Sequence, residues 1–161
     1  MKLPAWIAAA VSAIVLPACD YFNLKAIQPG VTTQAEIRSR MGEPGFIHPN
    51  DDGSVTWEYS RQPQGIHCYM IRFGRDLVVS QVEQVLTDEH FAQVQRGMRP
   101  EEIRRRFGAP ATRQVFANLG EEIWEWRIEG LPPTEETYFS VSFELASGGV
   151  KKWGKRVQLK G

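Results

Sequence analysis

Residues 30–44 read GVTTQAEIRSRMGEP, and residues 97–110 repeat this stretch, one residue shorter, as GMRPEEIRRRFGAP. Further along the chain, Trp-Glu-Tyr at 57–59 returns as Trp-Glu-Trp at 124–126. Both pairs are 67 residues apart (97 − 30 and 124 − 57). A repeat at one fixed offset predicts that a single unit was duplicated and that both copies are built from the same elements.

Each copy carries the signals of a short helix. Thr33 and Glu36 fit a capping box in the first copy, and Pro100 fits the first helical turn in the second. Gly-x-Pro at 42–44 and at 108–110 ends both helices. A further helix before each copy is predicted from an apolar pair three residues apart, at Leu24 and Ile27 and again at Phe91 and Val94.

After each proline the apolar period changes from helical spacing to alternation. Alternating runs occupy residues 56–60 and 69–73 in the first copy, and 124–128 and 139–143 in the second. We therefore predict an α+β fold, a tandem repeat of two helix-helix-antiparallel-sheet units. The first unit would span residues 19–86 and the second residues 87–161.

The amino-terminal 18 residues have the layout of a secretory signal, with Lys2 ahead of an apolar run. Leu-Pro-Ala-Cys at 16–19 resembles the lipobox of bacterial lipoproteins, which implies cleavage after residue 18 and lipidation of Cys19. An ordinary signal peptide ending near a cysteine, or an uncleaved anchor, are the alternatives. Asp20 resembles a signal for retention in the inner membrane.

Bulk composition narrows the class of partner. Lysine plus arginine equals aspartate plus glutamate at 19 each, which gives no electrostatic case for binding nucleic acid. Cys19 and Cys68 are the two cysteines of the sequence, so no disulfide framework is expected. Cys68 lies in an apolar run and is predicted to be a buried, inert thiol.

The repeated motif resembles the SmpA/OmlA (BamE-like) family of lipoproteins. The resemblance rests on glycines and prolines at matching places in both copies, together with the lipobox: Gly30, Gly42, Pro44, Gly97, Gly108 and Pro110. It implies a lipid-anchored protein on the periplasmic face of the outer membrane that supports barrel-protein assembly, with no catalytic residue and no cofactor. The familiar member has one unit where this chain has two. A tandem pair also resembles the fold of the β-lactamase inhibitory protein, which binds protein through its sheet.

The sequence lacks the pattern of an enzyme. His48, His67 and His90 fall in unrelated contexts, without the spacing of metal ligands. We therefore predict a protein that is not an enzyme and has neither a metal nor a cofactor.

Alternation instead selects polar strand residues as a candidate partner face: Glu58, Arg72, Glu125 and Arg127. The expected partners are other envelope proteins. A periplasmic inhibitor-like module is one alternative. Another is a structural lipoprotein that touches anionic lipid through the basic end of the chain, at Lys151, Lys152, Lys155, Arg156 and Lys160.

Overall fold

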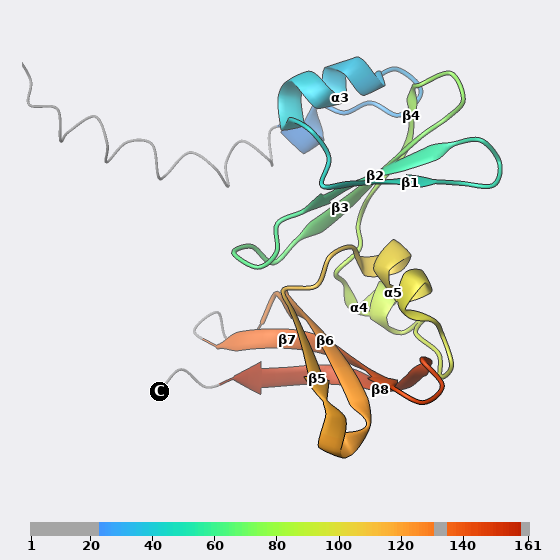
Figure 1. Ribbon diagram of the computed structural model, residues 1–161. Coiled ribbons are helices and arrows are strands. Elements are labelled where there is room, and N and C mark those ends of the chain that lie inside the picture. Colours follow the sequence, from blue (N-terminus) through green and yellow to red (C-terminus); the bar gives the residue numbers. More distant parts are fainter. Residues whose placement is uncertain (1–22, 131–134, 159–161) are drawn as a thin grey trace, which may run out of the picture.

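The computed structural model describes residues 23–130 and 135–158, and most of the ordered elements are strands (Figure 1). Two four-stranded antiparallel sheets follow one another along the chain. The first sheet has the order β1 (Phe46–Pro49), β2 (Val55–Ser60), β3 (Cys68–Phe73) and β4 (Val79–Gln84). The second has the order β5 (Thr112–Phe116), β6 (Glu121–Ile128), β7 (Glu136–Glu144) and β8 (Val150–Gln158). Both sheets therefore pair their strands in the same way.

The helices are short: α3 (Gln34–Met41), α4 (Asp88–Phe91), α5 (Pro100–Phe107) and the 3-10 turn η1 (Ala117–Leu119). The predicted capping box of α3 is confirmed, because the Thr33 N–H donates to the Glu36 carboxylate and the Glu36 N–H donates back to the Thr33 hydroxyl. Pro100 opens α5 as predicted. The same place in each copy thus starts a helix with different residues.

The predicted tandem of helix-helix-sheet units is wrong, because the fold is mostly β, with only a few short helices. α4 covers four residues, and Val94 lies beyond its end. In the first copy, residues 23–25 are helical and include Leu24, whereas Ile27 lies beyond them, ahead of turns and an isolated bridge. One apolar pair three residues apart fits a turn as well as a helix, and a helix of so few turns is not stable by itself.

Two apolar clusters arrange the elements in layers. One joins α3 to one face of the first sheet, through Ile37, Trp57, Tyr59, Ile71 and Phe73. The other joins α4 and α5 to the second sheet, and it also contains Cys68 and Met70 from the opposite face of the first sheet. Figure 1 shows α3 beyond the first sheet and α4 and α5 between the two sheets. The first sheet is therefore covered on both faces, and the second is covered by helices on one.

The repeated glycines keep equivalent places. Gly30 and Gly97 both have positive φ, and their N–H groups donate to Val79 and Val150, the first residue of the last strand in each sheet. Gly42 and Gly108 end α3 and α5 at φ values of 79° and 74°. A side chain would strain the backbone at all four positions, which explains why these residues recur.

Candidate functional site

The two halves of the chain meet at Glu58, in the middle of β2. Its neighbours Trp57 and Tyr59 face α3, so alternation sends the Glu58 side chain to the other face of the first sheet. There it is 1% exposed. The structure thus places this predicted partner-face residue in the interior, because α5 of the second half covers it.

Three residues surround the Glu58 carboxylate. Arg104 donates to both oxygens at 3.2 and 3.3 Å, the N–H of Ala109 donates at 2.8 Å, and His48 Nε2 lies 3.0 Å away. Burial acts to raise the pKa of Glu58, but the hydrogen bonds from His48 and Ala109 and the positive charge of Arg104 together outweigh it, so the pKa lies below its ordinary value. We call this contact between the two halves, made by Glu58, His48, Arg104 and Ala109, the junction. Its buried negative charge is matched by hydrogen-bond donors on all sides that the structure describes.

The helix end comes unusually close to the sheet at this point. A Cβ on Gly108 would lie 2.6 Å from the sulfur of Cys68 and 3.0 Å from the Glu58 carboxyl carbon. Cys68 is fully buried, and burial is the main cause of its raised pKa. A nucleophilic cysteine needs an accessible thiolate. Cys68 is therefore a buried thiol packed at the junction, as predicted.

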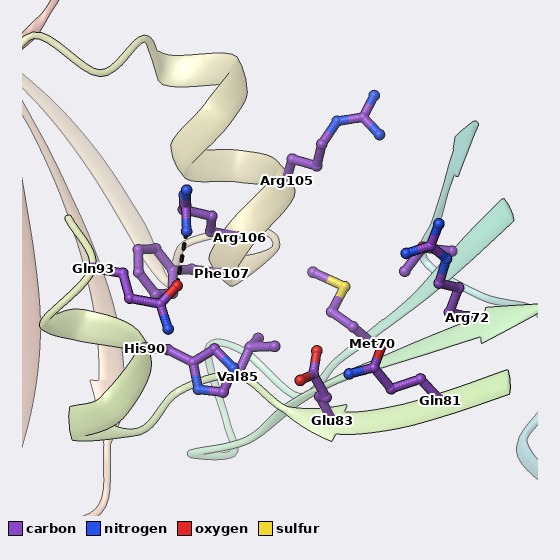
Figure 2. A pocket seen from close by; sticks show the side chains of 11 residues that line it. Met70, Arg72, Gln81, Glu83, Val85, His90, Gln93, Arg105, Arg106 and Phe107 are labelled. Atoms are coloured by element: carbon purple, nitrogen blue, oxygen red, sulfur yellow. Dashed lines mark hydrogen bonds between the residues drawn. The ribbon is translucent and has the colours of Figure 1, made fainter. Parts of the chain in front are cut away.

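Beside the junction lies a cleft of about 280 Å³ between β3 and β4 on one side and α4 and α5 on the other (Figure 2). Arg72, the second predicted face residue, lines it and pairs with Asp52 and Ser54 in the β1–β2 hairpin. Arg105 donates to Pro49, and Arg106 donates to Gln93 at 3.1 Å. Figure 2 shows these arginines pointing in different directions, so they do not converge on one ligand.

The second sheet carries the counterpart of this junction on its uncovered side. Glu125 matches Glu58 in the repeat, but its partners come from its own sheet: Arg156 donates at 3.0 and 3.1 Å and Ser140 at 2.7 Å. Arg127 pairs with Glu136 at the end of the same face. Its backbone exchanges two hydrogen bonds with Gln62 of the first half, at 2.7 and 2.9 Å. The four predicted residues therefore form two separate groups instead of one face.

We call the outward side of the second sheet the open face, and a hollow of about 490 Å³ lies on it. The residues that line it come from all four strands: Thr112, Gln114, Phe116, Ile123, Glu125, Ser140, Ser142, Lys152, Trp153, Gly154, Lys155 and Arg156. Apart from Glu125, sequence reasoning did not select these residues for a partner face. The signal was present in the alternation of β6 and β7, because Glu125 and Ser140 stand between buried residues of their strands.

Strand register explains the hollow. Phe46, Glu58, Met70 and Glu83 form one row across the first sheet. The corresponding row of the second sheet is Thr112, Glu125, Ser140 and Gly154. Small residues thus replace larger ones at three of the four positions. A Cβ built on Gly154 would meet no atom within 4 Å, so the space above it is empty.

The basic end of the chain is matched by carboxylates. Lys151 and Lys152 both pair with Glu121, at 2.8 and 3.0 Å, and Lys155 pairs with Asp88. Hydrogen bonds from Lys151, Ser142 and Lys152 lower the pKa of Glu121 to about 2. Lys160 lies outside the described residues, as do Cys19, Asp20 and the predicted signal peptide.

The histidines are spread over the described part of the chain. His67 stacks on Tyr69, and His90 bonds to the Thr87 hydroxyl at 2.8 Å. Within residues 23–130 and 135–158, no three His, Cys, Asp or Glu side chains gather as metal ligands would. No helix in the same ranges is long and apolar enough to cross a membrane.

No protein-family model and no curated protein matches this sequence, so the resemblance to the SmpA/OmlA family has no support beyond its motif. Among solved structures, the chain is similar to a putative β-lactamase inhibitor protein from Streptococcus mutans, with a TM-score of 0.36, 9% identity, and coverage of 88% of this chain and 97% of that one. It is also similar to a DUF4309 family protein from Bacillus subtilis, with a TM-score of 0.32, 14% identity, and coverage of 84% and 83%. The predicted likeness to the β-lactamase inhibitory protein thus has a counterpart among the neighbours. At these scores neither likeness carries an argument about what the chain does.

Proposed function

We propose that this chain is a non-enzymatic protein-binding module of the bacterial envelope and that the open face of the second sheet holds its partner. One observation carries the proposal. Equivalent faces of the two sheets differ, since the first holds α5 through Glu58, whereas no other element among the described residues covers the second around Glu125. The chain itself thus provides an example of a protein segment docked on this kind of face.

The open face also has the features of a binding surface. It is concave, and Phe116 and Ile123 supply apolar area next to charged groups. Because its polar side chains already bond to one another within the sheet, the face is held in shape before a partner arrives, which reduces the entropic cost of binding.

The place of action follows from the sequence motifs and is part of the proposal. Lipid on Cys19 would hold the domain at the periplasmic face of the outer membrane, where it would support barrel-protein assembly or envelope integrity. Asp20 keeps the inner membrane as the alternative. Substituting Cys19→Ala and fractionating the membranes tests the anchor, and fractionation of the unaltered chain identifies the membrane.

An inhibitor-like module is the second candidate, since a concave sheet face suits a protruding loop of an enzyme as well as an assembly partner. A headgroup-binding role has less support, because a membrane surface is flat and the hollow of the open face is concave. The identity of the partner separates the two protein-binding candidates. A barrel-assembly component indicates assembly, whereas a soluble enzyme indicates inhibition.

Site-specific crosslinking in cells tests the binding face. A photo-reactive residue is placed at Gln114, which is exposed on β5 within the hollow, and in a parallel strain at Ala35, which is exposed on α3. We expect capture of one protein from Gln114 and not from Ala35. The added substitution Gly154→Leu fills the hollow and should abolish the capture. Equal capture from both positions, or capture that Gly154→Leu leaves unchanged, would remove the open face as the binding surface.

A further inference from the structure

We infer that the partner presents an acidic segment, carrying an apolar side chain, to the hollow of the open face. This inference rests on the proposed function and specifies the chemistry of the partner. It comes from comparing the two equivalent sheet faces and asking which charge each face lacks.

In the first sheet, the buried carboxylate of Glu58 is neutralised by a cation from another element. This carboxylate bonds to His48 within the sheet. Its ion pair is made by Arg104 of α5, which belongs to the second half. The N–H of Ala109, which follows the end of the same helix, supplies another donor. A basic helix end is therefore the segment that completes this face.

In the second sheet, the equivalent carboxylate of Glu125 is neutralised from within the sheet. Arg156 of β8 places both Nε and Nη2 on the Glu125 carboxylate, and the Ser140 hydroxyl adds a further donor. Glu121 is likewise neutralised by Lys151 and Lys152. Since both carboxylates are satisfied from within the sheet, a cationic partner would gain little from them.

The charges that a partner would meet are positive. Lys152 and Arg156 are 63% and 47% exposed, whereas the carboxylates beneath them, Glu121 and Glu125, are 5% and 20% exposed. The rim of the hollow along β8 is thus cationic at its surface. Complementary charge steers and selects partners, so this rim favours a segment with carboxylates.

The floor of the hollow accepts an apolar side chain. Ile123 lies in the row next to the small residues, and Gly154 leaves space where Glu83 stands in the first sheet. Filling this space would remove apolar surface from water on both sides. The combination fits a segment with one apolar anchor flanked by acidic residues.

Two other occupants fit less well. A second copy would offer α3, the counterpart of α5, whose last turn carries Arg38 and Arg40 and would meet the cationic rim with like charge. An anionic membrane is flat, whereas the hollow is concave.

The test uses the full domain after residue 18 and two synthetic amphipathic helical peptides of equal length. Both peptides have the same leucine stripe, and one is flanked by glutamates and the other by lysines. We expect the glutamate peptide to bind about tenfold more tightly at low salt, and the preference to shrink near 1 M salt, where the Debye length is about 3 Å. Amide resonances of Ile123, Ser140 and Gly154 should shift on binding.

Two variants locate the effect. Gly154→Leu should abolish binding of both peptides, whereas Ala35→Leu, which adds the same side chain to an exposed position on α3, should leave it unchanged. Lys152→Glu should reverse the preference, and Lys151 remains to pair with Glu121 in that variant.

Several outcomes would overturn the inference: equal or tighter binding of the lysine peptide, binding of neither peptide, binding to vesicles of anionic lipid in place of the peptides, or self-association that Gly154→Leu abolishes. Failure here is distinguishable from failure of the proposed function. Capture from Gln114 that Gly154→Leu blocks would keep the open face as a protein-binding surface, with a partner of different charge.

Discussion

Glu58→Gln tests whether a buried charge holds the two halves together. The substitution keeps the shape of the side chain and removes its negative charge. Arg104 then lacks a counter-ion, and the single amide oxygen cannot accept from Arg104, the Ala109 N–H and His48 at once. At least one donor at the junction therefore loses its bond.

The contacts set the expected size of the effect. A hydrogen bond to a charged group contributes about 1.5–3 kcal/mol, and breaking a buried ion pair on one side costs about 3–5 kcal/mol. Arg104 is 30% exposed and can turn toward water, which reduces the loss. We expect Glu58→Gln to lower the free energy of unfolding by about 2–3 kcal/mol. Glu125→Gln is the matched control and should cost under about 1 kcal/mol, since its pair with Arg156 lies near the surface.

Urea unfolding followed by tryptophan fluorescence measures both losses, and a double-mutant cycle with Arg104→Gln isolates the pair. A coupling energy of about 1–3 kcal/mol is expected between residues in direct contact. If Glu58→Gln costs no more than Glu125→Gln, or if the losses from Glu58→Gln and Arg104→Gln simply add, the junction does not depend on this charge.

The same carboxylate gives the junction a pH dependence. Because the pKa of Glu58 in the folded protein is below its ordinary value of 4.5, the charge stabilises the fold fully above that pH. The contribution is lost as the pH falls through the lower pKa of the folded state. Unfolding midpoints measured from pH 6 downward should therefore drop more steeply for the unaltered chain than for Glu58→Gln. Parallel curves would contradict this reasoning.

Three further predictions concern the junction. Gly42→Ala and Gly108→Ala impose the same backbone strain of about 1–3 kcal/mol, and Gly108→Ala should cost about 1–3 kcal/mol more in urea unfolding, because its Cβ meets Cys68 and Glu58 while that of Gly42 meets no atom within 4 Å. Equal losses would mean that the helix end is not pressed against the sheet. Gln62→Ala removes both hydrogen bonds to the Arg127 backbone and should cost about 1–2 kcal/mol by thermal unfolding, and no loss would show that this bridge is dispensable. Cys68 should react with a thiol reagent only at the rate of unfolding, and rapid reaction of the folded protein would contradict its burial.

Local patterns were sufficient to locate strands and helix ends. Alternation in residues 69–73 and 139–143 marks parts of β3 and β7, because every second residue of each strand lies in one apolar cluster. The extra helices are shorter than the spacing predicted, because α4 ends at Phe91 and Val94 packs from beyond the helix. Spacing alone does not separate a turn from a helix when only one pair is available.

The sequence did not predict that a distant segment would bury Glu58. Glu58 and Glu125 follow a tryptophan in the same repeated motif, and both were predicted to face outward. One is buried and the other is on the open face because Arg104, 46 residues from Glu58, folds onto the first sheet only. Local sequence fixes the direction of a strand side chain, whereas tertiary packing decides what lies opposite.

The open face also has a purely structural explanation, since charged residues on an exposed face keep a protein soluble. That explanation accounts for the lysines of β8 and for the self-neutralised Glu125. It does not account for the missing bulk, because a face that only meets water has no use for an empty space over Gly154 beside the apolar Ile123. Solubility requires only that such a face be charged, whereas binding a partner also requires that its shape be complementary. The hollow, more than the charges around it, is therefore the feature that favours binding.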